Sequence, residues 1–334
     1  HDHSGLGAGI FPKGQTPRDH PNGLCYLTDE FQPVDYLNQL LDQALLEAEG
    51  MAEIGTLEDV WADMNVDKVL HEMEQFSQEI QYRNKEMVAN KHLPIADRLK
   101  GNRDFELLAK KFGTAADACE SMISQWEFTS SDDNSLAVAM QLAAQKEFGL
   151  NRASIWYSQE VMDRARKEWG EYEDGIRAFL REQYNVTQGY LKEQGVTHIT
   201  LVRGSNWVPD EQDFLSGIPW DGTLSSAPLD LQPMSSFSSE YEMAVDFVTG
   251  WDMHNMVSVA RVPIEDVIGT GLTGFGADCQ SEFVVLGKNN WEVFHLSYGP
   301  DTESSDYRDI KDVLDEIVTS KKKVWKDLDA YGII

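Results

Sequence analysis

Three short blocks in the C-terminal part of the chain contain the residues best suited to chemistry. Arg203 ends the first block, Ser236 and Ser238 lie in the second, and Glu282 lies in the third. An arginine can bind a phosphate, serine hydroxyls can anchor a sugar or an amide, and a carboxylate can stabilise a developing cation. Together, these groups suit cleavage of the glycosidic bond of a nucleotide.

The first block is a run rich in β-branched residues, and it ends at Arg203, which precedes Gly204. At the end of a strand, the guanidinium can donate two hydrogen bonds to a phosphate, and the glycine would let a ligand approach the backbone. The alternative is an ordinary edge-strand arginine that pairs with one of the chain's 57 acidic residues. The local sequence leaves both interpretations open.

The second block places two hydroxyls on one face of a predicted strand. Ser236 and Ser238 are two residues apart, so their side chains share a face and Phe237 points to the other. One hydroxyl can then orient a carboxylate while the other contacts a ligand. Alternatively, the serine cluster marks the start of a helix, because Ser239 and Glu242 have the spacing of a capping box.

The third block combines an amide with a carboxylate. Gln280 and Glu282 are two residues apart, which would place them next to each other on one face of a strand. The preceding segment Gly271–Gly276 is rich in glycine, and we expect a flexible loop that exposes Phe275 to a substrate. The alternative is a strand whose polar residues simply face solvent.

The composition argues against several other classes of function. The chain has 28 basic and 57 acidic residues, a net charge of −29, so we expect neither nucleic-acid nor membrane binding. Three widely spaced cysteines suggest neither a disulfide framework nor a zinc site. We also predict no metal, because the histidines near the N-terminus lie in a segment without a sustained pattern. The sequence contains no glycine-rich phosphate loop and no nucleophile motif.

The elements that must position these blocks are mainly helical in the first half of the chain. We expect an extended arm over residues 1–33 and a helical region over residues 34–150. A loop with a helix cap is predicted at 130–134. The apolar periodicity predicts helices over residues 35–48, 57–87, 114–126, 136–148, 159–191, 239–249 and 307–325.

After the last long helix, short runs of β-branched or aromatic residues alternate with Gly, Pro and Ser turns. The predicted strands span residues 198–202, 234–237, 257–262, 282–286 and 291–297. We therefore predict an α+β fold, in which a helical N-terminal region precedes a mostly antiparallel β structure with flanking helices.

In order and spacing, the three blocks resemble the motifs of the mono-ADP-ribosyltransferases of the arginine–serine–glutamate class. The resemblance covers roughly residues 184–298, where the motifs read Leu201-Val-Arg203-Gly, Ser236-Phe-Ser238 and Gln280-Ser-Glu282. It implies that residues 151–334 form a catalytic domain, built as a split β-sandwich with an NAD cleft between its sheets. The residues implied to bind NAD are Arg203, Gly204, Ser236, Phe237 and Ser238.

By the same resemblance, the chain transfers ADP-ribose from NAD to a protein side chain and releases nicotinamide, with no metal. Arg203 would bind the NAD phosphates, Ser236 would support the site, and Glu282 would contact the ribose and stabilise the oxocarbenium ion. Gln280 would face the acceptor, and family members with glutamine there usually modify a side chain other than arginine. Phe275 would help to bind the protein target.

A second resemblance lies near the N-terminus. His20-Pro-Asn-Gly-Leu-Cys25 is similar to the end of a His-Pro-x-Cys segment of phage minor head proteins, some of which carry such a transferase domain. It implies a virion protein that contacts other virion proteins and modifies bacterial host proteins in the host cytoplasm; otherwise we expect a cytoplasmic or exported effector. Two alternatives stay open: an NAD glycohydrolase, in which water replaces the target, and a non-catalytic virion component that retains the fold.

Overall fold

The computed structural model describes residues 60–330 apart from short gaps, and these residues belong to one compact unit, Asp59–Ile334. The gaps are residues 91–93, 129–131, 151–152, 208–218, 228, 230, 250–253 and 289–290. The predicted arm, the predicted helix over 35–48, the N-terminal histidines and the segment His20–Cys25 lie outside the described residues.

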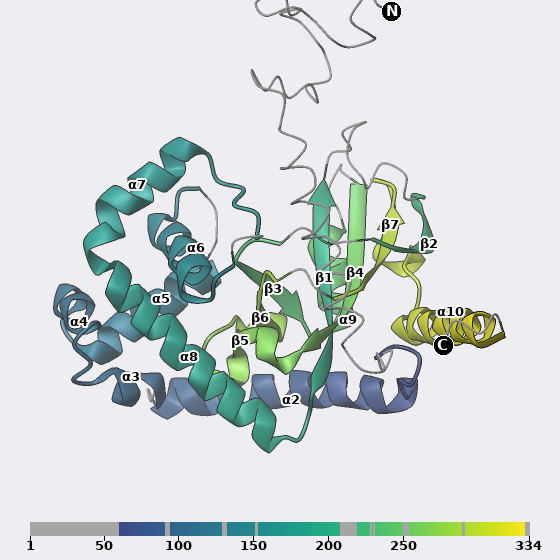
Figure 1. Ribbon diagram of the computed structural model, residues 1–334, viewed down its shortest axis with the longest axis horizontal. Helices are drawn as coiled ribbons and strands as arrows, with labels where there is room; N and C mark the ends of the chain where they lie inside the picture. The colour runs from purple at the N-terminus through teal and green to yellow at the C-terminus, as the bar shows by residue number, and fades with distance from the viewer. Residues whose placement is uncertain are drawn as a thin grey trace, which may run out of the picture. The chain divides into compact units, whose positions relative to one another are not determined.

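The fold is α+β, as predicted, with helices that precede and flank one antiparallel sheet (Figure 1). The helices are α2 (Val66–Asn90), α3 (Pro94–Leu99), α4 (Glu106–Phe112), α5 (Ala115–Phe128), α6 (Ser135–Glu147), α7 (Gln159–Trp169), α8 (Glu173–Glu193), α9 (Tyr241–Val248) and α10 (Ile310–Ala330). The strands are β1 (His198–Trp207), β2 (Asp221–Ser226), β3 (Met234–Ser238), β4 (His254–Pro263), β5 (Val267–Thr270), β6 (Glu282–Leu286) and β7 (Val293–Tyr298).

All five predicted strands are present, and the structure adds β2 and β5. Neither additional strand has a strong local signal: β2 reads Asp-Gly-Thr-Leu-Ser-Ser, and β5 contains four residues. Both gain their hydrogen bonds from strands that the sequence does predict, β2 from β7 and β5 from β6. Edge strands of this kind depend on the pairing partner more than on their own propensity.

A local side-chain cap marks the start of one helix of the helical region. The Asn134 side chain accepts a hydrogen bond from the Ala137 amide at 3.1 Å and starts α6, as predicted.

The single helix predicted over 159–191 is two helices, because the chain forms a short 3₁₀ turn at Gly170–Tyr172 between α7 and α8. Gly195 follows α8 with a φ of 71°, a conformation that favours glycine after a helix.

The capping box predicted at Ser239 is wrong. The N-cap of α9 is Glu240, which makes no side-chain cap hydrogen bond. The Ser239 hydroxyl instead donates to the Ser281 carbonyl at 3.4 Å and lies 2.9 Å from the Ser77 hydroxyl of α2. Tertiary partners from the turn before β6 and from α2 therefore bind the hydroxyl that the local sequence assigned to the helix start.

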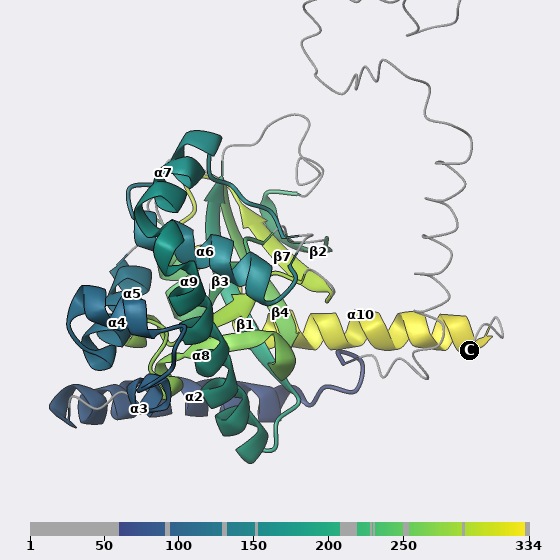
Figure 2. The same ribbon diagram turned by 60° about the vertical axis from the view of Figure 1, so that its left-hand side comes forward.

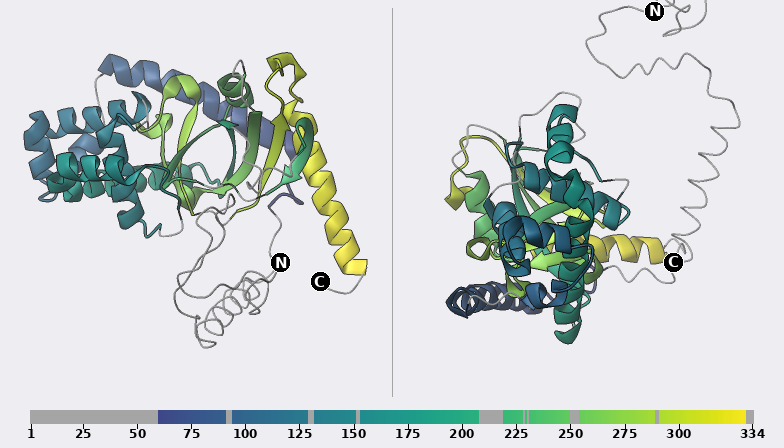
Figure 3. Two further views of the ribbon diagram at one scale, coloured as in Figure 1. Left: turned by 90° about the horizontal axis from the view of Figure 1, so that it is seen from above. Right: turned by 90° about the vertical axis from the view of Figure 1, so that its left-hand side faces the viewer.

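The sheet has the strand order β2-β7-β4-β1-β3-β6-β5, with every pair antiparallel. Strand β1 pairs with β4 along its whole length, but with β3 at one position, where Val202 lies opposite Ser238. The sheet is therefore almost divided between β1 and β3, and the two halves curve apart when they are seen from above (Figure 3). The first two predicted functional blocks lie on the strands beside this division, and Glu282 begins β6, which pairs with β3.

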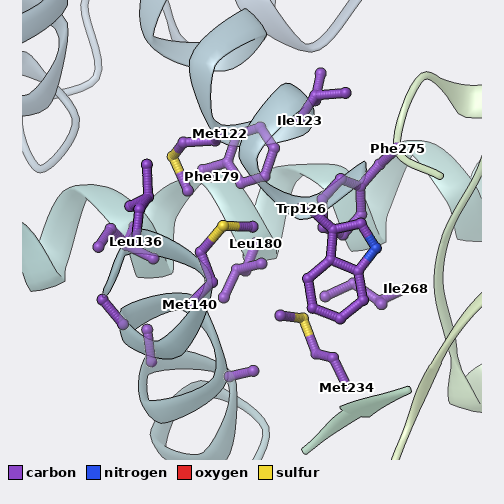
Figure 4. Close-up of a cluster of buried hydrophobic side chains, with 14 of the residues drawn as sticks. Met122, Ile123, Trp126, Leu136, Met140, Phe179, Leu180, Met234, Ile268 and Phe275 are labelled. Atoms are coloured by element: carbon purple, nitrogen blue, oxygen red, sulfur yellow. The ribbon is translucent and has the colours of Figure 1, made fainter. Parts of the chain in front are cut away.

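Helices cover the two halves of the sheet differently. The α3–α8 group lies beside β3, β6 and β5, with α8 crossing in front of the sheet (Figures 1 and 2). Its apolar side chains form one hydrophobic core with residues from the sheet (Figure 4). On the other half, α10 contributes Leu314 and Ile317 to a core with Phe294 and Leu296 of β7. The helical region and the sheet thus share a core instead of packing separately.

Buried polar side chains attach the helices to specific strands. Gln141 of α6 donates to the carbonyl of Met234 at 2.8 Å and accepts from its amide at 2.7 Å. Thr187 of α8 donates to the Ile268 carbonyl of β5 at 2.9 Å. Such bonds orient the start of β3 and the edge strand relative to the helices.

Among the described helices, none has the length and apolarity required to cross a membrane.

Candidate functional site

Arg203 lies on β1 near the division in the sheet. It directly follows Val202, which lies opposite Ser238 of β3. Its guanidinium donates to the carbonyl oxygen of Ser236, across the gap between β1 and β3, and lies 5.9 Å from the centre of the Phe237 ring. Burial lowers the pKa of Arg203, and the negative charge of Glu282 acts in the opposite direction. The arginine therefore connects the two halves of the sheet and places a positive charge close to Glu282.

Gly204 has a packing role that the sequence did not suggest. A β-carbon at this position would lie 2.3 Å from the Ala244 carbonyl oxygen and 3.0 Å from a methyl group of Val248. The absent side chain therefore makes room for α9, whereas the sequence analysis expected it to make room for a ligand. The Gly204 backbone still lines the cavity that is described below.

The two serines of β3 have different surroundings. Ser238 is buried; its hydroxyl donates to the Gln280 carbonyl at 2.7 Å and accepts from the Glu240 amide at 2.9 Å. Ser236 is half-buried and lines the cavity beside Arg203. Ser238 thus orients the turn that precedes β6, and Ser236 is the serine of the pair whose hydroxyl is better placed for a ligand.

Phe237 points away from the two serines, as the strand alternation predicts. Its ring packs in the core against Trp291, with the ring centres 6.0 Å apart, and only 2% of the residue is exposed. Phe237 also lines the cavity that is described below, so its contact with the cofactor stays a prediction. Its ring provides the apolar surface over which the Arg203 guanidinium lies.

Glu282 is the first residue of β6 and is 3% exposed. The indole N–H of Trp126 donates to its Oε1 at 3.2 Å, and the Ala277 amide donates to its Oε2 at 2.5 Å. One donor comes from α5 and the other from the turn before the strand. Both carboxylate oxygens are therefore oriented, which is what an electrostatic role beside a developing cation requires.

Gln280 does not lie on the strand with Glu282. It ends the 3₁₀ helix Asp278–Gln280, and Ser281 then adopts a left-handed conformation with a φ of 47°. This turn separates the two side chains, so the prediction that they share one strand face is wrong. Gln280 is exposed, and both residues nevertheless line the same cavity.

Phe275 is buried, which corrects the prediction of an exposed aromatic in a flexible loop. Its exposed fraction is 0%, and its ring centre lies 5.7 Å from that of Trp126 and 5.6 Å from that of Phe179 (Figure 4). Glycines here serve close packing: a β-carbon on Gly269 of β5 would lie 2.4 Å from the Phe275 ring, and one on Gly271 of the loop would lie 2.7 Å from a methyl group of Ile80. The helices cover this ring, so it cannot bind a protein target.

A cavity of about 310 Å³ lies where the three blocks meet. Its polar lining comes from Glu127, Arg203, Ser236, Ser238, Gln280 and Glu282, and helices α5 and α9 supply much of the apolar lining. Two aromatic side chains at its edge are strongly exposed, Phe128 at 81% and Phe247 at 61%. The site thus combines a buried carboxylate with an open, apolar entrance.

Negative charge accumulates around Glu282. Partial desolvation, together with the charges of Asp278 and Glu282, raises the pKa of Glu127 to about 7. Burial and the charge of Glu282 raise the pKa of Asp278 to about 6. Perturbed carboxylates in a cleft with one half-buried arginine are typical of functional sites. In the described ranges, no three His, Cys, Asp or Glu side chains form a group suited to a metal ion.

Trp126 and Glu127 are site residues that the sequence analysis missed. Both lie near the end of α5, and Trp126 is separated from its hydrogen-bond partner Glu282 by 156 residues. Locally, Trp126 continues the apolar face of its helix and Glu127 is an ordinary polar neighbour, so no local signal distinguishes them.

Comparison with known proteins adds no homologue: no family model, no curated protein and no solved structure matches the chain.

Proposed function

We propose that the chain is an NAD-dependent mono-ADP-ribosyltransferase that transfers ADP-ribose to a protein side chain and releases nicotinamide. The observation that carries the proposal is the convergence of Arg203, Ser236 and Glu282, from three different strands, around one cavity. Their order in the chain is that of the arginine–serine–glutamate transferases, which these blocks resemble. The sequence and the geometry therefore point to the same chemistry.

Arg203 would bind the phosphates of NAD. Its guanidinium has one donor directed to the Ser236 carbonyl and further N–H groups available in the same plane. Partial burial strengthens its attraction for an anion because the surrounding dielectric is low. Ser236, on the adjacent strand, would donate its hydroxyl to the ribose or to the nicotinamide amide.

Glu282 would stabilise the positive charge that develops on the ribose as nicotinamide leaves. The donors from Trp126 and Ala277 fix the carboxylate before the substrate binds, so little reorganisation is needed during the reaction. The bond between the ribose C1′ and nicotinamide breaks, and its electron pair neutralises the pyridinium nitrogen. The leaving group is already good, and the protein mainly has to position charge.

The cavity volume of about 310 Å³ lies at the lower end of the range for ligand pockets. It suits the nicotinamide ribose end of NAD, with the adenosine end extending towards the open side. The exposed rings of Phe128 and Phe247 at the entrance favour a macromolecular acceptor over water alone. This entrance is the observation that favours a transferase over an NAD glycohydrolase.

The proposal is tested with adenine-labelled NAD and a bacterial lysate, comparing the native chain with Glu282→Gln. We expect discrete labelled proteins with the native chain, and a loss of nicotinamide release of at least about 100-fold in the variant. Glu193→Gln, an exposed carboxylate at the end of α8, is the matched control. Free ADP-ribose without labelled protein would favour a glycohydrolase, and no NAD consumption would favour a non-catalytic virion component.

Delivery by a phage particle is part of the same proposal. It rests on the His20–Cys25 segment, which lies outside the described residues. Under this proposal, the chain is packaged with other virion proteins and modifies a host protein in the bacterial cytoplasm. Its presence in purified particles, measured by mass spectrometry, would support delivery, and its absence there would contradict it.

A further inference from the structure

A second carboxylate reaches the cavity from the helical region. Glu127 lies one residue before the end of α5, and it lines the same cavity as Glu282 and Gln280. Its neighbour Trp126 is fixed by the hydrogen bond to Glu282, and this bond also fixes the backbone from which Glu127 projects. Glu127 is exposed at the mouth of the cavity, and it projects from a helix instead of a loop.

Transfer to a protein side chain needs a group that accepts a proton. The acceptor loses a proton as its bond to the ribose forms, and the Gln280 amide, which faces the acceptor in this arrangement, has no basic atom. Among the described residues that line the cavity, the carboxylates are Glu127 and Glu282. Both oxygens of Glu282 accept hydrogen bonds from Trp126 and Ala277, which directs this carboxylate to the ribose side.

Two other side chains that could accept a proton, Asp278 and His295, do not line the cavity. Asp278 is close to the backbone of Gly271, where a β-carbon would lie 2.7 Å from its Oδ1, and it does not line the cavity. His295 is buried in the sheet, with Nδ1 2.9 Å from the Ser258 hydroxyl and Nε2 3.0 Å from the Ala227 carbonyl. Neither can reach an acceptor at the cavity entrance.

We propose that Glu127 is the general base for the acceptor, an inference that rests on the proposed transferase function. In this step, the acceptor atom forms a bond to the ribose C1′ from which nicotinamide departs, and the acceptor proton moves to the Glu127 carboxylate. The electron pair of the broken bond stays with nicotinamide, which leaves as a neutral molecule, and the positive charge of NAD leaves as the acceptor proton, which Glu127 then releases to solvent. Atoms and charge therefore balance without a further reactant.

The electrostatic surroundings suit this role. Partial desolvation and the negative charges of Asp278, from the turn before β6, and Glu282, from β6, raise the pKa of Glu127 to about 7. A base whose pKa lies near the working pH combines a useful ionised fraction with a good proton affinity. Transfer should therefore increase as the pH rises through about 7.

The test compares Glu127→Gln with the native chain, using adenine-labelled NAD and a bacterial lysate. Nicotinamide release and covalent labelling of protein are measured in the same reaction. We expect labelling to fall by about 100-fold or more, while nicotinamide release into water continues, and we expect the dependence of labelling on pH near 7 to disappear. Glu120→Gln, an exposed glutamate on the same helix, is the matched control.

The possible results separate this inference from the proposed function. If the native chain labels protein and Glu127→Gln labels it equally well, the role of Glu127 is wrong and the transferase function stands. If both nicotinamide release and labelling fall together in Glu127→Gln, with an unchanged melting temperature, Glu127 acts on bond cleavage and the assignment as acceptor base is also wrong. If the native chain consumes no NAD, the proposed function fails and the inference fails with it.

Discussion

The indole N–H of Trp126 donates a hydrogen bond of 3.2 Å to Oε1 of Glu282, and both residues are buried. Trp126 belongs to α5 of the helical region, and Glu282 begins β6, in the half of the sheet that this region packs against. The helical region therefore contributes directly to the site instead of only covering it. In a buried environment, a bond from a neutral donor to a carboxylate is one of the stronger side-chain contacts.

Trp126→Phe should lower the rate of nicotinamide release while leaving the KM for NAD nearly unchanged. The variant keeps an aromatic ring but removes the donor to Glu282, and the loss of a hydrogen bond to a charged group costs about 1.5–3 kcal/mol. We therefore expect kcat to fall by about tenfold or more.

Trp169→Phe is the matched control, because the Trp169 indole donates to the Ser135 hydroxyl at 3.0 Å, away from the cavity. Its stability should decrease by about 1 kcal/mol without any change in kcat. Equal kcat values for Trp126→Phe and the native chain, measured by nicotinamide release, would contradict a positioning role for Trp126.

Arg203→Lys should weaken NAD binding by about tenfold or more, as measured by calorimetry. A lysine retains the charge but lacks the planar set of donors that can contact a phosphate and the Ser236 carbonyl together. The comparison is Arg261→Lys on β4, whose side chain donates to the Thr200 hydroxyl at 3.3 Å and does not line the cavity. Similar affinities for the two variants would argue against phosphate binding by Arg203.

Gly204→Ala should destabilise the protein by about 1–3 kcal/mol, because the new methyl group would overlap the Ala244 carbonyl and force α9 away from β1. Unfolding in urea measures the change in free energy. Gly189→Ala on α8 is the opposite control: nothing lies within 4 Å of its added β-carbon, so the helix should gain up to about 1 kcal/mol. A neutral result at Gly204 would show that α9 can move without cost.

Asp278→Asn should stabilise the protein at alkaline pH and have little effect at acid pH. The pKa of Asp278 is raised from an ordinary 3.8 to about 6, so between these values the folded protein binds more protons than the unfolded chain. Stability contributed by this group therefore falls as the pH rises through that interval. Asparagine removes the charge, and with it both the cost of burying that charge and its repulsion with Glu282.

The expected gain for Asp278→Asn is on the order of 1 kcal/mol above about pH 7, since the group is only partly buried. Urea unfolding at about pH 4.5 and about pH 8 would measure it, with the exposed Asp301→Asn as control. A gain of the same size at both pH values would mean that the buried charge of Asp278 is not its cause.

Much of the fold was accessible from local sequence. The strand Glu282–Leu286 begins and ends where its apolar run predicts, and Asn134 caps α6 at the predicted position. Gly195 ends the long helical stretch before β1, also as predicted. These features depend on side-chain periodicity, capping hydrogen bonds and backbone conformations, all of which act between residues close together in the chain.

The composition of the site depended on the tertiary structure. Phe275 follows glycines that suggest an exposed loop, yet rings from α5 and α8 bury it, because an apolar ring is more stable in contact with other apolar groups than with water. Trp126 becomes a partner of Glu282 because the shared core of the helical region and the sheet brings α5 to β6. The three motif positions could thus be read from residue types and their order, whereas the groups that orient Glu282 are set by long-range packing, which local patterns do not encode.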